Sequence, residues 1–123
     1  EPDMFVKKID SVPKVKVNIG VNAWKQVMIG VQEAPHFAMR RFVVEPGGSI
    51  PSHTNTVEHE QFVIKGRARI GIGQKVYDVT KNDTVYIPAD TPHWYQVIGE
   101  EPFEFICVVP NKEDIIEVLE ENG

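Results

Sequence analysis

Short runs rich in apolar, β-branched and aromatic residues dominate this chain from residue 37 onward, and proline or glycine interrupts them at short intervals. Runs of this kind between turn residues predict short β-strands, in which successive side chains point to opposite faces. The runs with this pattern are 37–44, 61–64, 68–72, 84–87, 95–98 and 103–109. Regularly spaced short strands are typical of a β-sandwich or β-barrel, and we therefore expect an all-β domain.

The choice of apolar residues supports this expectation. Counted along the sequence, the chain has 18 Val and 12 Ile but one Leu. Branching at Cβ disfavours helices and suits the pleated surface of a sheet. The N-terminal part is less regular, since residues 4–9 and 14–19 alternate like strands, whereas residues 24–31 fit a strand or a loop.

Only the tail has a helical pattern. Ile115, Val118 and Leu119 are spaced as on one helix face, and Asn111 is a suitable N-cap, so a short C-terminal helix is predicted. We expect one domain over residues 1–123, with N-terminal strands or an arm at 1–30, the barrel at 31–110 and the helix at 111–123.

Charge and cysteine content exclude several kinds of partner. The formal net charge is −5, and the basic residues are scattered among acidic ones, so no basic stripe is present to follow a nucleic acid. No apolar run approaches the length of a membrane span, and we expect no membrane partner. The single cysteine, Cys107, cannot form an internal disulfide and favours a reducing compartment, so we expect a cytoplasmic protein.

Three of the four histidines predict a metal site. His53 and His59 would lie roughly 20 Å apart if the segment between them were fully extended, too far to share an ion. Because Asn55 and Thr56 favour turns, we expect a hairpin that brings the two histidines side by side on adjacent strands. His93 follows a strand and a turn stiffened by two prolines. The fourth histidine, at position 36, is expected to be an ordinary solvated residue.

The segment around the first two histidines resembles the first motif of the cupin superfamily. That motif is a glycine, five residues, His-x-His, three residues, an acidic or histidine ligand, six residues and a glycine. The matching positions in this chain are Gly47, His53, Asn55, His59 and Gly66.

A second segment resembles the second cupin motif, with Asn82, Pro88, Asp90 and His93 at its characteristic positions. Asn82 and Asp90 stand where glycine is usual, and both residue types tolerate left-handed backbone. The chain is similar to small single-domain manganese cupins of thermophiles. That resemblance implies a jelly-roll barrel, or double-stranded β-helix, with a divalent metal held by His53, His59 and His93.

Two departures from the motifs affect this implied metal shell. Asn55 replaces a usual histidine and His59 a usual glutamate, so the shell would be three imidazoles with Asn55 or water in fourth place. Such a shell suits Mn first by resemblance, with Fe, Zn, Ni, Co or Cu as alternatives.

Strand parity selects further candidates for the site. Gln61 shares a face with His59 and would order a metal-bound water or bond a ligand. Cys107 is either a small buried apolar residue or a thiol beside the metal. Of Arg40 and Arg41 one must point inward, and we favour Arg40 as a pocket cation for a carboxylate or enolate. Glu58 and Glu60 have the opposite parity and belong to a charged outer face.

The function expected from these features is a metal-dependent oxidoreductase, resembling a dioxygenase, that acts on a small organic molecule. The alternatives are a non-catalytic module that binds a small ligand and a metal-free dimeric barrel. Phe62 and Ile64 lie on the strand face opposite His59 and need a cover, so we expect a homodimer.

Overall fold

The computed structural model describes residues 4–119, and in this part of the chain nearly all regular structure is β-strand. Among these described residues, the one helical element is the short 3₁₀ turn η1 (Ile9–Ser11). The strands are β1 (Val15–Lys16), β2 (Val21–Ile29), β3 (Phe37–Asn55), β4 (His59–Lys65), β5 (Arg67–Ile72), β6 (Lys75–Thr80), β7 (Thr84–Ile87), β8 (His93–Ile98), β9 (Phe103–Pro110) and β10 (Ile116–Val118). The expected all-β fold is therefore confirmed.

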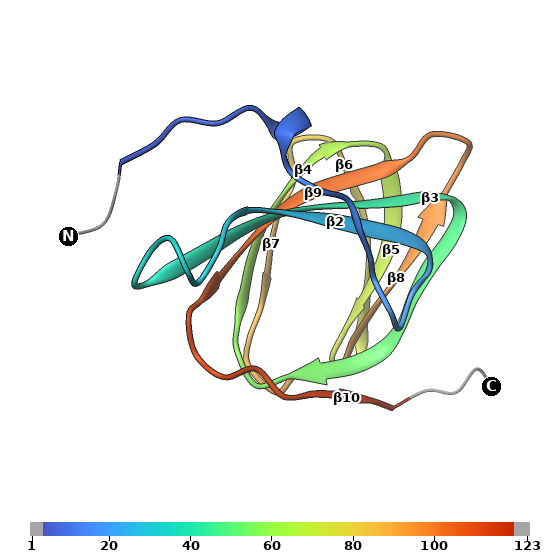
Figure 1. The fold of residues 1–123 in the computed structure, drawn as a ribbon. Coiled ribbons are helices and arrows are strands. Elements are labelled where there is room, and N and C mark those ends of the chain that lie inside the picture. Colours follow the sequence, from blue (N-terminus) through green and yellow to red (C-terminus); the bar gives the residue numbers. More distant parts are fainter. Residues whose placement is uncertain (1–3, 120–123) are drawn as a thin grey trace.

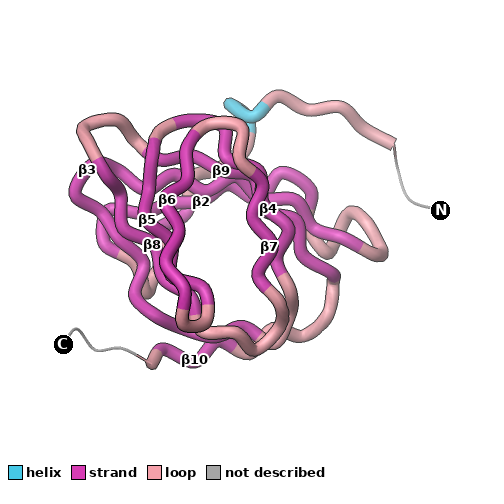
Figure 2. The backbone as a smooth tube through the Cα atoms, turned by 180° about the vertical axis from the view of Figure 1, so that it is seen from behind, coloured by secondary structure: helices cyan, strands magenta, loops and turns pink. Residues whose placement is uncertain are grey.

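All ten strands belong to one antiparallel sheet that curls around a common axis (Figure 1; Figure 2 shows the same barrel from behind). The main order is β6-β5-β8-β3-β9-β4-β7, and β2 and β10 pair with the long strand β3 outside this path. Because β3 pairs with four strands along its length, it positions both the core and the barrel mouth.

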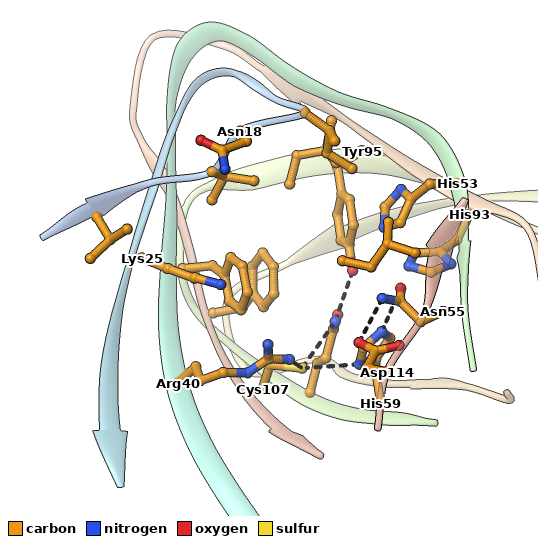
Figure 3. A pocket seen from close by; sticks show the side chains of 18 of the residues that line it. Asn18, Lys25, Arg40, His53, Asn55, His59, His93, Tyr95, Cys107 and Asp114 are labelled. Carbon is orange, nitrogen blue, oxygen red and sulfur yellow. Dashed lines mark hydrogen bonds between the residues drawn. The ribbon is translucent and has the colours of Figure 1, made fainter. Parts of the chain in front are cut away.

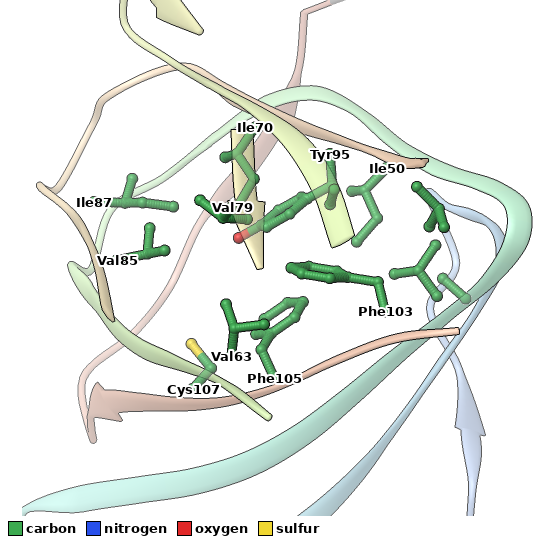
Figure 4. Packing of buried hydrophobic residues seen from close by; sticks show 14 of the residues in the cluster. Ile50, Val63, Ile70, Val79, Val85, Ile87, Tyr95, Phe103, Phe105 and Cys107 are labelled. Carbon is green, nitrogen blue, oxygen red and sulfur yellow. The ribbon is translucent and has the colours of Figure 1, made fainter. Parts of the chain in front are cut away.

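The core fills one part of the barrel interior (Figure 4). Strand β9 shows how the sequence produces it, since Phe103, Phe105, Cys107 and Val109 alternate with residues that are less buried. The side chains with almost no exposed surface are mostly aromatic or β-branched, as the composition predicts: Phe103, Phe105, Ile70, Ile87, Val43, Val44 and Val63.

The turns of both motifs adopt left-handed backbone at the positions where the motifs have glycine. Gly47 and Gly66 have φ values of 81° and 84°, and the non-glycine residues Asn82 and Asp90 have 79° and 63°. The prediction that asparagine and aspartate substitute for glycine at these positions is confirmed.

The predicted C-terminal helix is wrong for the described part of the tail, and residues 120–123 lie outside the described residues. Strand β10 instead pairs with β3, with Ile116 opposite Asn55 and Val118 opposite His53. The sheet edge offers unpaired backbone groups to this segment, and that tertiary pairing outweighs a short helical pattern.

The N-terminal part also differs from its sequence pattern. Residues 4–8 form no strand, whereas β2 covers most of the segment for which strand and loop both fitted the sequence. The pattern did not indicate β6, whose side chains are mostly exposed. Within residues 4–119 no helix is long and apolar enough to cross a membrane.

Candidate metal and ligand site

His53, His59 and His93 come from three different strands and meet at one end of a cavity of about 230 Å³ (Figure 3). The ring centroids of His53 and His93 are 4.2 Å apart, and those of His59 and His93 are 5.4 Å apart. All three side chains are buried, with 7 %, 5 % and 2 % of their surface exposed. The structure thus brings together the three histidines predicted as metal ligands.

The predicted hairpin between the first two histidines is wrong in its pairing. The chain does turn after Asn55, but β3 and β4 are separated in the sheet by β9. His53 instead lies opposite His93 in the pairing of β3 with β8. The histidines approach each other because the sheet curls, and a local turn rule cannot anticipate that curvature.

Backbone carbonyls fix two of the three imidazoles. His53 Nδ1 donates to Pro51 O at 2.7 Å, and His93 Nδ1 donates to Thr91 O at 2.9 Å. In a neutral ring, a proton on Nδ1 leaves the lone pair on Nε2, the atom that can coordinate a metal. Burial lowers the pKa of His53 below its usual value and that of His93 to about 4, so both rings are neutral near pH 7.

His59 is held differently, through Asn55 and Asp114. Asn55 Nδ2 donates to Asp114 Oδ2 at 2.9 Å, which leaves Asn55 Oδ1 to accept from His59 Nε2, also at 2.9 Å. His59 Nδ1 lies 3.6 Å from Cys107 Sγ and can accept its proton. Burial, followed by the charge of a protonated His93, lowers the pKa of His59 to about 3. Both ring nitrogens of His59 are therefore engaged.

The remaining predicted site residues surround these histidines. Gln61 Nε2 donates to Tyr95 Oη at 2.8 Å and points toward Cys107 Sγ at 3.6 Å. Arg40 Nη2 donates to Cys107 Sγ at 3.3 Å, so the thiol lies inside the cavity lining. Burial raises the pKa of the Cys107 thiol, the opposite of what an activated nucleophile needs.

Arg40 and Arg41 lie on opposite faces of β3, and Arg40, the one favoured by strand parity, faces inward. Arg40 lines the cavity, whereas Arg41 donates to Gln26 Oε1 at 2.7 Å and forms a 2.6 Å ion pair with Glu104. The outer-face carboxylates, Glu58 and Glu60, are exposed as predicted, and His36 lies outside the cavity lining.

Sequence reasoning did not identify Lys25, Tyr95 and Asp114, which also line the cavity. Tyr95 shares strand parity with His93 and could have been found by that signal. Asp114 enters only because the tail folds back onto β3, and Lys25 because β2 joins the sheet. No local pattern marks either of them.

Three neutral imidazoles and an amide oxygen fit a divalent transition metal in their chemistry. As they stand, no group of three or more His, Cys, Asp or Glu side chains in residues 4–119 is arranged to hold an ion. At His59, Nε2 donates to Asn55 and so presents no lone pair there. An ion that uses this atom must replace that hydrogen bond, and the ring proton must move to Nδ1.

The fold and the site together define a class of protein, a curled antiparallel barrel with a histidine cluster at one end. A match to the cupin domain covers residues 40–109, which is more than half of the chain. The chain therefore belongs to the cupin family.

The sequence identity to individual relatives is low. An acireductone dioxygenase of Cronobacter sakazakii is 30% identical over 98 residues, which are 76% of this chain and 51% of that protein. The chain thus spans about half the length of the curated relatives that it matches.

Two solved structures illustrate the shared fold. The polyketide cyclase RemF of Streptomyces resistomycificus superposes with a TM-score of 0.89, covering 98% of this chain and 88% of that one, at 21% identity. Oxalate decarboxylase of Bacillus subtilis, studied for its Mn(II) centres, has a TM-score of 0.71 at 20% identity and covers 80% of this chain and 28% of that one. Identities this low show the fold alone.

Proposed function

We propose that this chain is a small metal-dependent cupin enzyme of the oxidoreductase, dioxygenase-like type that acts on a small organic molecule. His53, His59 and His93 hold one divalent transition metal, and Asn55 or water completes the shell. Manganese is the first candidate, with Fe, Zn, Ni, Co and Cu as competitors. The observation that carries the proposal is the pair of backbone carbonyls that hold the Nδ1 protons of His53 and His93.

That arrangement supports metal binding because a ligating histidine usually donates its other ring proton to a carbonyl or carboxylate. The low pKa values of His59 and His93 add to it, since protons do not compete with an ion at neutral pH. The names of the dioxygenase relative and of the Mn(II)-containing decarboxylase agree with metal chemistry on this fold.

The other side chains around the cavity have roles that follow from their contacts. An ion held by these histidines would supply Lewis-acid or redox chemistry to a small molecule in the cavity. Gln61 orients a bound molecule beside the histidines, and Arg40 offers positive charge to a carboxylate or enolate. Cys107 is held by Arg40 and His59, so its role is to position these two groups rather than to attack substrate.

Metal titration tests the proposal directly. Protein stripped with a chelator is titrated with Mn, Co and Zn salts by calorimetry, and we expect one ion per chain. His53→Ala and His93→Ala should each weaken binding by more than roughly a hundredfold, because each loses a direct ligand. His36→Ala is the matched control and should bind as the parent does. Stoichiometric metal in both ligand variants would overturn the proposal.

Asn55→His provides a gain-of-function test. An imidazole is a better ligand for these ions than an amide oxygen, and the change also removes the acceptor that occupies His59 Nε2. We expect tighter metal binding than in the parent and, if substrate uses the fourth position, slower oxygen consumption. Unchanged or weaker binding would mean that residue 55 does not face the ion.

A non-catalytic, metal-free ligand-binding module is the second candidate. The engagement of both His59 nitrogens favours it, because the cavity then needs no ion to satisfy this ring. A protein that binds small molecules but no metal in the titrations above would support this alternative. The homodimer and the cytoplasmic location remain proposals, resting respectively on the exposed Phe62 and on the single cysteine.

A further inference from the structure

The cavity is more positive than the chain as a whole. Lys16, Lys25 and Arg40 line it, and among residues 4–119 Asp114 is the one acidic residue in its lining, although the chain has a net charge of −5. Asp114 already accepts from the side chain of Asn55 and the backbone N–H of Thr56. A partly enclosed site with this charge balance attracts small anions.

Two unpaired polar atoms belong to side chains that line this cavity. Among residues 4–119 three buried side-chain polar atoms have no hydrogen-bond partner, and two of them are Arg40 Nε and Gln61 Oε1. The other end of each group is engaged, by Cys107 and Tyr95 respectively, so neither can turn away without losing a contact. A ligand with an acceptor for Arg40 and a hydroxyl for Gln61 satisfies both atoms.

An aromatic wall connects the cations to the histidines (Figure 3). Phe42 and Phe105 are stacked with centroids 5.1 Å apart, and Tyr95 continues the stack 5.3 Å from Phe105. The Arg40 guanidinium lies 5.0 Å from the Phe42 centroid. A dry cavity of roughly 150 Å³ accepts benzene, so about 230 Å³ has room for one ring with substituents.

We propose that this cavity binds a small single-ring hydroxy carboxylate. Its carboxylate lies on Arg40 and Lys25, its hydroxyl donates to Gln61 Oε1, and its ring packs against Phe42 and Phe105. The inference deepens the proposed function by naming the ligand of the same cavity. It depends on the cations, the amide and the aromatic wall, none of which is a metal ligand.

The test uses metal-free protein and simple probes. Benzoate, the three isomers 2-, 3- and 4-hydroxybenzoate, and uncharged 3-hydroxybenzamide are titrated by calorimetry. At least one hydroxybenzoate should bind about tenfold more tightly than benzoate, the effect of one well-made hydrogen bond. 3-Hydroxybenzamide should bind at least about tenfold more weakly than 3-hydroxybenzoate, because it lacks the charge. The preferred isomer reports the spacing of the two polar atoms.

Variants assign the contacts. Gln61→Met should abolish the advantage of the hydroxyl over benzoate, whereas Arg40→Met should weaken every carboxylate about tenfold or more. Arg69→Met removes an exposed cation on β5 and should change nothing.

Equal binding of benzoate and all hydroxybenzoates, or an advantage that survives in Gln61→Met, would overturn the inference. The ligand series on the parent protein decides the matter even if a variant fails to fold. Ligand binding without metal binding would instead contradict the proposed function alone, and metal binding without ligand binding would contradict this inference alone.

Discussion

Acidification should destabilise the metal-free protein through its buried histidines. Burial lowers the pKa of His59 to about 3 and that of His93 to about 4, both below the usual value of 6.5 in an unfolded chain. Between the folded-state pKa of each histidine and 6.5, the unfolded state binds more protons than the folded state. The contribution of these histidines to stability is therefore fully present above pH 6.5 and is lost as pH falls. At pH 5 each histidine then costs roughly 2 kcal/mol relative to pH 7. Urea unfolding of chelator-treated protein at pH 7 and pH 5, followed by tryptophan fluorescence, measures this loss.

Matched variants separate the histidines from every other titrating group. In His59→Gln the difference in unfolding free energy between pH 7 and pH 5 should shrink by roughly 2 kcal/mol, whatever the absolute stability of the variant. His36→Gln, which changes a histidine outside the cavity lining, should keep the full difference. An identical pH dependence in the parent and in His59→Gln would refute the argument that burial keeps this ring neutral.

Three further predictions concern the fold and its assembly. Gly66→Ala should cost more than roughly 4 kcal/mol in urea unfolding, because its Cβ would lie 2.2 Å from a backbone oxygen. Gly47→Ala, with a similar φ but open space, should cost roughly 1–2 kcal/mol, and equal costs would contradict the steric argument. Arg41→Met should destabilise by roughly 1–3 kcal/mol by leaving the partly buried Glu104 without its partner; a loss under about 0.5 kcal/mol would count against this. Light scattering should give a dimer mass that Phe62→Glu reduces to a monomer, and a monomeric parent would exclude the dimer.

The barrel could be predicted from the sequence because its signals are local. Strand parity puts Phe103, Phe105, Cys107 and Val109 on one face of β9, which is the buried one, and turn residues such as Asn82 indicate where the backbone becomes left-handed. Where strand order is nonlocal, the same reasoning fails. The pairing of β3 with β8, which places His53 opposite His93, depends on the curl of the whole sheet.

The residues of the candidate site also fall into those with a local sequence signal and those placed by nonlocal strand pairing. Parity identifies Gln61 as inward, because it shares a face with His59, and it favours Arg40 over Arg41 without deciding between them. Asp114 could not be found, because its position depends on a tail that pairs with the sheet although its own pattern is helical. Because Asp114 orients the Asn55 amide, the hydrogen bond from His59 Nε2 to Asn55 Oδ1 could not be predicted either.

The contacts of His59 can be weighed against the proposed metal by their sizes. A hydrogen bond such as that from His59 to Asn55 contributes about 1 kcal/mol net to stability. Structural zinc in small peptides binds with a free energy of about 10–16 kcal/mol at neutral pH, which is much larger than the contribution of one such hydrogen bond. Proton competition at the ring is also absent near pH 7, because the pKa of His59 is about 3. If the protein nevertheless binds no metal, this hydrogen bond is not the obstacle, and Asn55→His, which removes it, would not restore binding.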